Sequence, residues 1–232
     1  MAQVSEWMWT DDDGSPSKLS IDTQISVPSY KRPFDVAFGS ILLVLSAPLF
    51  VVVALLVKLT SRGPVLFRQE RIGQRGVPFT VLKFRTMRAD ADPTTHRNYF
   101  MQYLNGVSAP GEPSNVFKLR RDSRITSVGR FLRRLGLDEL PQLINVLRGE
   151  MSLVGPRPPL AYEVAHYSNH HLLRLATKPG LTGLWQIRGR DVVDFDTMVG
   201  MDLEYVQNMS PTLDLKILIL TGPSLVWALV KR

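Results

Sequence analysis

The chain has 232 residues, of which 44% are hydrophobic, so its composition excludes wholesale disorder and suits one domain of ordinary size. Its formal net charge of +7 predicts anionic partners, such as nucleic acid, anionic lipid or phosphorylated substrates. The sequence contains no cysteine, which excludes disulfides, a thiol nucleophile and a cysteine-ligated metal site.

Residues 1–30 are predicted to form a mobile N-terminal tail. They contain the acidic run "DDDG" and several serines and prolines, and they have neither the basic start nor the early apolar core of a secretory signal. The acidic run is interpreted as a solvated charge run, because a metal site is rarely built on a flexible terminus.

The next segment, Val36–Val57, is an uncharged apolar run between Asp35 and Lys58. A run of this length predicts a membrane helix and is favoured over a buried core helix. Pro48 lies near its middle, removes one backbone hydrogen bond and favours a bend.

The charges that flank this apolar run leave its topology open between a span and a re-entrant helix. Basic residues lie on both sides, so they give no inside–outside bias. A helix that bends and returns would keep both flanks at one anionic leaflet, and the charge symmetry favours this re-entrant form. The flanking basic residues are Lys31, Arg32, Lys58 and Arg62.

Residues 64–87 predict a β-hairpin, because two β-rich runs flank the turn sequence "GQRG". Lys83 and Arg85 are two positions apart and would share one face of a strand. Together with Arg68, Arg71 and Arg75 they are a candidate cationic site, although each one alone also fits a solvated strand face. Residues 89–116 are predicted to be loops around a short helix at "RNYFMQYL".

A helix is predicted over Ser123–Gly136, and Gly136 is a suitable residue to end it. This helix would either lie in the membrane interface or pack on the core with a solvated face, and both interpretations stay open. The apolar stripe consists of Ile125, Val128, Phe131, Leu132 and Leu135, and Arg130, Arg133 and Arg134 decorate it.

Two adjacent carboxylates, Asp138 and Glu139, follow in "LDELPQL". A second helical stripe begins at Leu140, which would put Asp138 at the N-cap and Pro141 in the first turn. The cap explains the acids fully and is the favoured interpretation from this stretch alone. A helix N-terminus also binds phosphate, and a carboxylate can attack phosphorus as a nucleophile, so the second interpretation remains.

Three later segments complete the pattern. Arg157 lies between prolines in "SLVGPRPPL", and the stiff backbone would present its guanidinium to phosphate. The stretch "KPGLTGLWQIRGR", which includes Arg190, resembles an anion-binding loop. The C-terminal "LDLKILILTGPSLVWALV" is strongly apolar but is interrupted by "TGPS", so we expect it to pack on the core or lie on the membrane without spanning it.

Read together, these segments resemble the bacterial sugar transferase family, the monotopic polyprenyl-phosphate phosphoglycosyl transferases. The resemblance runs from about Lys31 to Thr221 and is closest to the short exopolysaccharide-priming members. Family members break their membrane helix at a Ser-Pro pair, whereas here Ala47 separates Ser46 from Pro48. The motifs that carry the resemblance are "KRPFD", "QERIG", "LKFRTM", "LRRLGLDELPQLINVLRGEMSLVGPRPP" and "KPGLTGLWQIRGR".

The resemblance implies an α+β, predominantly helical fold with a re-entrant membrane helix over 31–62, a small β-hairpin and interfacial amphipathic helices. Residues 63–232 would form a catalytic domain on the cytoplasmic face of the bacterial inner membrane, with an interfacial C-terminal helical segment. The implied partners are a UDP-sugar, undecaprenyl phosphate and membrane lipid. A homodimer is left open, and no nucleic acid is expected.

The implied reaction transfers a phosphosugar from the UDP-sugar to undecaprenyl phosphate, which primes exopolysaccharide or capsule synthesis and releases UMP. The sugar is expected to be a hexose such as galactose or glucose. By resemblance, Asp138 is the nucleophile, and Glu139 acts as a base or joins Asp138 in holding Mg²⁺. The motif positions Lys83, Arg85, Arg157 and Arg190 are assigned to phosphate and nucleotide contacts.

Two other functions compete with this hypothesis. One is a non-catalytic, membrane-anchored scaffold for polysaccharide assembly, and the intact Asp138–Glu139 pair argues against it. The other is a basic nucleic-acid binder, which the long apolar segment and the scarcity of aromatic residues among the basic stretches disfavour.

Overall fold

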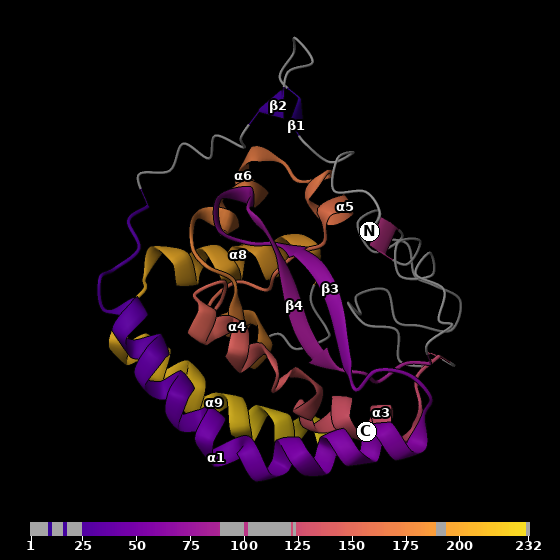
Figure 1. The fold of residues 1–232 in the computed structure, drawn as a ribbon. Coiled ribbons are helices and arrows are strands. Elements are labelled where there is room, and N and C mark those ends of the chain that lie inside the picture. The colour runs from indigo at the N-terminus through magenta and orange to yellow at the C-terminus, as the bar shows by residue number, and fades with distance from the viewer. Residues whose placement is uncertain are drawn as a thin grey trace.

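The computed structural model describes residues 9–10, 16–17, 25–88, 100–101, 122, 124–188 and 194–230, and this part of the chain is mostly helical (Figure 1). Most of the predicted N-terminal tail, most of the segment "RNYFMQYL" and Arg190 lie outside these residues. The elements are β1 (Trp9–Thr10), β2 (Pro16–Ser17), α1 (Lys31–Thr60), β3 (Leu66–Ile72), η1 (Gln74–Gly76), β4 (Pro78–Phe84), α3 (Ser127–Leu135), η2 (Leu137–Glu139), α4 (Gln142–Arg148), β5 (Ser152–Val154), α5 (Ala161–Val164), α6 (Asn169–Leu172), η3 (Leu173–Ala176), β6 (Gly180–Thr182), α7 (Leu184–Arg188), α8 (Phe195–Gln207) and α9 (Pro211–Val230).

The long helix α1 confirms the predicted apolar helix and contains Pro48 in its interior. Figure 1 shows that α1 bends along its length. The Ser46 hydroxyl donates to the Leu42 carbonyl at 2.7 Å, one turn before the proline interrupts the hydrogen-bond ladder. Within the described residues, α1 is the one helix long and apolar enough to cross a membrane. Whether it spans or re-enters stays a prediction.

Exposed apolar side chains occur in both halves of α1, on a different face from the buried ones. Val44 and Leu45 are 72% and 73% exposed and Leu59 is 82% exposed, whereas Val53 and Val57 are each 1% exposed. A soluble protein rarely leaves so many large apolar side chains of one helix in water, and an exposed stripe of this kind marks a membrane or partner surface.

The predicted hairpin is confirmed, because β3 and β4 pair antiparallel from Leu66 opposite Phe84 to Ile72 opposite Pro78. The turn between them runs through η1, where Arg75 has a positive φ of 55°. The hairpin contacts α1 at its open end, where Phe84 packs in one cluster with Val53 and Val57.

Helix α3 ends as predicted, because Gly136 takes the left-handed conformation with φ 68°. Its start is capped by Thr126, whose hydroxyl accepts from the Gly129 amide at 2.9 Å. The predicted apolar stripe is only partly correct. Leu132 is fully buried, but Phe131 is 55% exposed and does not belong to the core.

Two short strands that the sequence patterns presented as loops form a second sheet. Strands β5 and β6 pair in parallel, with Ser152 opposite Gly180 and Val154 opposite Thr182. The backbones beyond this pair approach so closely that a Cβ on Gly180 would lie 2.1 Å from the Gly155 amide nitrogen. Glycine is therefore required at this contact for a steric reason.

The C-terminal segment is a single helix, α9, that continues through Gly222 and Pro223. The interruption of the apolar sequence by "TGPS" therefore does not break the helix, and the Thr221 hydroxyl donates to the Ile217 carbonyl at 2.7 Å just before the proline. Figure 1 shows α1 and α9 along one side of the molecule. The main buried cluster packs α9 together with β4, α4, β5 and α8. Its members include Val81, Val146, Leu153, Tyr205 and Ile217.

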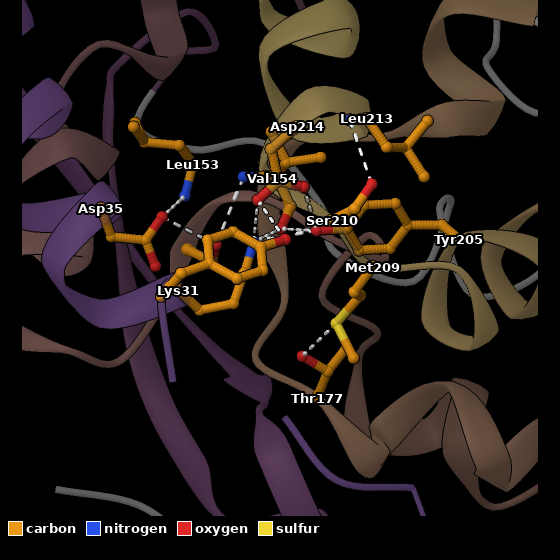
Figure 2. Close-up of polar contacts among 12 residues, drawn as sticks. Lys31, Asp35, Leu153, Val154, Thr177, Tyr205, Met209, Ser210, Leu213 and Asp214 are labelled. Atoms are coloured by element: carbon orange, nitrogen blue, oxygen red, sulfur yellow. Dashed lines mark hydrogen bonds and ion pairs between the residues drawn. The ribbon is translucent and has the colours of Figure 1, made fainter. Parts of the chain in front are cut away.

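One of the predicted membrane flanks is not available to lipid. Lys31 is only 4% exposed, and its Nζ atom donates to the Val154 carbonyl at 2.8 Å and to Asp214 at 3.0 Å (Figure 2). The interpretation of Lys31 as a residue that faces the anionic leaflet is therefore wrong, because the protein itself supplies the compensating carboxylate.

Candidate active site

The Asp138–Glu139 pair lies in η2, a single tight turn between α3 and α4. The two leucines on either side, Leu137 and Leu140, belong to the apolar cluster that contains Val53 of α1. The leucines that flank the two acids therefore pack the turn in one cluster with the long apolar helix. Asp138 is 8% exposed, whereas the Glu139 side chain is 39% exposed.

The helix-cap interpretation of Asp138 is wrong. Helix α4 begins only at Gln142, its N-cap position is occupied by Pro141, and no side chain caps it. Both acids lie in the separate turn η2, and Pro141, with its fixed φ, comes after that turn. The cap therefore no longer explains why the chain carries two adjacent carboxylates here.

A lysine from the hairpin reaches the second acid of the pair. Lys83 of β4 places its Nζ atom 3.0 Å from Glu139 Oε1. Arg71, on the neighbouring strand β3, is buried, and this burial lowers its pKa to about 10, with the charge of Arg157 acting in the same direction and Glu139 acting against it. Arg71 therefore lies within the electrostatic reach of both Arg157 and Glu139.

Arg133 brings a further cation to the carboxylates from α3. Its Nε atom donates to the Thr86 hydroxyl at 2.8 Å. Burial of the guanidinium lowers the pKa of Arg133, while the negative charges of Asp138, Asp122 and Glu139 oppose that shift. The sequence offered no signal for this role, because Arg133 was one of three arginines beside the apolar stripe.

The close contact between α3 and the end of the hairpin depends on Gly129. A Cβ at this position would lie 2.1 Å from the Thr86 carbonyl oxygen, so any larger residue would push the helix away from the strand. The Thr126 amide donates to the same carbonyl at 3.0 Å. These contacts fix the start of the helix that carries Arg133.

Arg157 is held in the predicted proline-rich segment directly after β5. Its Nη1 atom lies 3.3 Å from Glu163 Oε2, and the Glu163 side chain is 1% exposed. The loop is attached to β3 at two carbonyls: Pro158 accepts from Arg71 at 3.0 Å, and Pro159 accepts from the Ile72 amide at 2.9 Å. The structure thus supports the prediction that Arg157 is presented on a constrained backbone.

Arg85 and Lys83 contact different partners, and whether they share one face of the strand stays a prediction. Strand β4 ends at Phe84, and the Arg85 Nη2 atom donates to the carbonyl and the hydroxyl of Ser61, each at 2.7 Å. Its Nε and Nη1 atoms are buried without a hydrogen-bond partner among the described residues. Arg85 therefore retains unused donors beside the end of α1, and its substrate role stays a prediction. The assignment of Arg190 cannot be placed, because that residue lies outside the described ones.

The carboxylate oxygens of the turn are compatible with Mg²⁺ only if substrate phosphates supply further ligands. Carboxylate oxygens are the ligands that Mg²⁺ prefers, and the ion often takes one or two of them together with substrate phosphates. Within the described part of the chain, no group of three or more histidine, aspartate or glutamate side chains could hold a metal. Asp138 and Glu139 therefore fit Mg²⁺ that arrives with a phosphorylated substrate.

Comparison with known proteins identifies relatives of this chain. The family model described as bacterial sugar transferase matches residues 27–228. The exopolysaccharide production protein ExoY of Rhizobium meliloti is 44% identical over 194 residues, which are 84% of each chain.

Two further relatives have names that state an activity. The UDP-glucose:undecaprenyl-phosphate glucose-1-phosphate transferase of Caulobacter vibrioides is 41% identical over 211 residues, 88% of this chain and 72% of its own. The undecaprenyl-phosphate galactose phosphotransferase of Salmonella typhimurium is 42% identical over 193 residues, 83% of this chain and 39% of its own. With the match of the family model over most of its length, this chain belongs to the bacterial sugar transferase family.

Proposed function

We propose that this protein transfers a sugar 1-phosphate from a UDP-sugar to undecaprenyl phosphate, the first step in building an exopolysaccharide or capsule repeat unit. The observation that carries the proposal is the turn η2, where Lys83 pairs with Glu139, the charge of Arg133 interacts with both carboxylates, and Leu137 and Leu140 pack in one cluster with α1. Cations beside carboxylates suit a phosphorylated donor, and an adjacent apolar helix suits a lipid acceptor.

In the first half-reaction, an Asp138 carboxylate oxygen attacks the β-phosphorus of the UDP-sugar. A bond forms between this oxygen and phosphorus, the bond from phosphorus to the bridging oxygen breaks, and UMP leaves with that oxygen and its electron pair. Lys83, Arg71 and Arg133 contribute positive charge where the phosphoryl oxygens and the departing UMP carry negative charge. Arg157, on its constrained loop, contacts the nucleotide diphosphate.

In the second half-reaction, a phosphate oxygen of undecaprenyl phosphate attacks the same phosphorus. The bond to Asp138 breaks, the carboxylate is regenerated, and undecaprenyl-diphosphate-sugar is released. Glu139, more exposed than its neighbour, is placed to accept a proton from the acceptor phosphate when that phosphate arrives protonated. Bound Mg²⁺, held by Asp138 and Glu139 together with the diphosphate, would neutralise charge on the donor.

The same geometry supports a proposal for the location of the reaction. Because η2 packs on α1, the chemistry takes place beside the membrane helix, and we assign the catalytic domain to the cytoplasmic face of the inner membrane, where UDP-sugars are available. The names of the relatives include both glucose and galactose transferases, which supports a hexose donor.

The test is UMP release by the purified protein in detergent with Mg²⁺, undecaprenyl phosphate and a panel of UDP-sugars. We expect release with one hexose donor and its loss in Asp138→Asn. In the absence of acceptor, mass spectrometry should find one phosphosugar on the peptide that contains Asp138. Glu139→Gln should form this adduct but transfer it slowly.

The matched control is Asp196→Asn, because the Asp196 side chain is 84% exposed and pairs with His171, far along the chain from the turn. This variant should release UMP at the wild-type rate. If folded wild-type protein releases no UMP with any sugar, the transferase proposal fails and a non-catalytic scaffold becomes the better explanation.

A further inference from the structure

The first turn of α1 is fixed to the domain by a buried polar cluster that the proposed chemistry does not use (Figure 2). Lys31 Nζ donates to three oxygens: the Val154 carbonyl at 2.8 Å, the Tyr205 hydroxyl at 2.8 Å and Asp214 at 3.0 Å. The Tyr205 hydroxyl donates to the other Asp214 oxygen at 2.7 Å. The cluster therefore joins α1 to the end of β5, to α8 and to the start of α9.

A second contact of the same turn acts on the same strand. Asp35 accepts from the Leu153 amide and from the Ser152 hydroxyl, each at 2.9 Å. Asp35 is 2% exposed, so this contact is as deeply buried as that of Lys31. Lys31 and Asp35 therefore hold consecutive backbone groups of β5, one through a carbonyl and the other through an amide.

The third contact is made to the helix that follows the carboxylate turn. Arg32 donates to the Val146 carbonyl at 2.8 Å and to the Leu147 carbonyl at 2.7 Å, both in the last turn of α4. Gly149, which ends α4 with φ 83°, has the Arg32 guanidinium beside it. One helical turn thus contacts both segments that lead to the site.

The placement of these contacts along the chain is specific. Val154 is the last residue of β5, and the loop that presents Arg157 begins directly after it. Helix α4 follows η2, which carries Asp138 and Glu139, after Leu140 and Pro141, and Arg32 holds the C-terminal end of this helix. Small displacements of catalytic groups have large effects on rate and binding, so a clamp at these two points can set the geometry of the site.

Stability alone is a weak explanation of such a cluster. Removing Lys31 and Asp214 from water is costly, and well-packed apolar residues of similar volume are often equally stable in place of a buried ion pair. The polar groups of the first turn instead specify one arrangement of α1 against three backbone carbonyls and one backbone amide. Because hydrogen bonds are directional, they restrict the position of α1 relative to the site more than apolar packing would.

We propose that Lys31, Arg32 and Asp35 are positioning residues, which fix the Arg157 loop and α4 relative to α1. The position of α1 on the domain then determines the affinity of the site for the donor. The effect on donor binding rests on the proposed function, whereas the ordering of the loop does not. The order of the Arg157 loop thus depends on the polar contacts of the first turn of α1, and apolar packing does not replace them.

The experiment compares Lys31→Met with wild type and with Lys58→Met, a lysine at the other end of the same helix whose side chain is exposed. Hydrogen exchange of the amides of Leu153, Val154 and Gly155 is measured first, because it requires no substrate. We expect faster exchange at these amides in Lys31→Met and no change in Lys58→Met. Asp214→Asn, which keeps the shape of the site, serves if Lys31→Met does not fold.

Kinetics of the first half-reaction provide the second measurement. We expect the KM for the UDP-sugar to rise about tenfold in Lys31→Met with a smaller change in kcat. The reason is that this variant would lose the order of the loop that binds the nucleotide but would keep the nucleophile Asp138. A Lys31→Arg variant, which restores a donor to the same acceptors, should recover part of the loss.

Unchanged exchange at residues 153–155 in a folded Lys31→Met or Asp214→Asn variant overturns the proposal. Faster exchange with an unchanged KM also overturns it, since the loop would then not control donor binding. If wild-type protein shows no transferase activity, the proposed function fails, and the exchange measurement still decides whether the first turn of α1 orders the loop.

Discussion

The Nζ atom of Lys83 lies 3.0 Å from Oε1 of Glu139 and joins the β-hairpin to the turn that carries both carboxylates. The lysine side chain is 25% exposed and the glutamate side chain is 39% exposed, so solvent screens the pair. An ion pair of this kind contributes little to folding. Its value lies instead in holding a cation beside the carboxylates, where a phosphorylated donor would bind.

Lys83→Met is therefore expected to separate activity from stability. UMP release should fall about 100-fold, as when a group that stabilises transition-state charge is removed, while the free energy of unfolding changes by less than about 1 kcal/mol. Release assays and chemical unfolding in detergent measure the two quantities. Lys216→Met, which removes an exposed lysine from α9, should change neither, and a large loss of stability in Lys83→Met would contradict the prediction.

Asn145 is expected to be a structural requirement of the site. Its side chain is 0% exposed: the carbonyl accepts from the Leu82 amide at 3.1 Å, and the amide nitrogen donates to the Thr80 carbonyl at 2.8 Å. Asn145→Leu leaves both backbone groups of β4 without partners, so the free energy of unfolding should fall by about 3 kcal/mol.

The measurement for Asn145→Leu is chemical unfolding followed by circular dichroism. Because Asn145 links α4 to β4, a variant that still folds should also show faster hydrogen exchange at the Leu82 amide. Wild-type stability together with wild-type exchange at Leu82 is the result that would refute this role.

The exposed apolar side chains of α1 are expected to determine membrane affinity without affecting the core. Leu45 is 73% exposed, and a lysine at the centre of a membrane helix costs about 3 kcal/mol. Leu45→Lys should therefore bind vesicles about 100-fold more weakly while unfolding normally in detergent. Val77→Lys is the control, because Val77 is 62% exposed but lies at the hairpin turn. Equal vesicle binding by the two variants would argue against membrane contact through the exposed side chains of α1.

The features that could be predicted from the sequence are those governed by local rules. A run of apolar residues over Val36–Val57 gives a helix in any context, and the β-rich runs around "GQRG" give a hairpin. Gly136 ends α3 because its left-handed conformation is inexpensive only for glycine. In each case the deciding interaction lies within a few residues along the chain.

The features that could not be predicted depend on partners far apart in the sequence. Lys31 was interpreted as a membrane flank because its partner Asp214 lies 183 positions away. The parallel strands β5 and β6 contain three residues each, which is too short for a period of two to appear. Asp138 fitted the cap rule locally, but Pro141 starts α4 later than the apolar stripe implied.

The start of α8 provides a pH-dependent test of the fold outside the site. Asp194 caps this helix: its carboxylate accepts from the Thr197 amide at 2.8 Å and from the Thr197 hydroxyl at 2.7 Å. These hydrogen bonds, that of the amide first, lower the pKa of Asp194 below its ordinary value of 3.8. Because the folded pKa lies below the unfolded one, the stabilisation is complete above the ordinary value and is lost as the pH falls through the folded pKa.

Asp194→Ala should therefore reduce the free energy of unfolding by about 1 kcal/mol at neutral pH, with a difference that shrinks as the pH falls below the ordinary range. Asp194→Asn isolates the ionisation, because asparagine is a good cap that does not titrate, and its stability relative to Asp194→Ala should vary little with pH. Urea unfolding of the three proteins across the acid range measures these differences. A deficit in Asp194→Ala that stays constant to the lowest pH would mean that the ionised carboxylate does not stabilise α8.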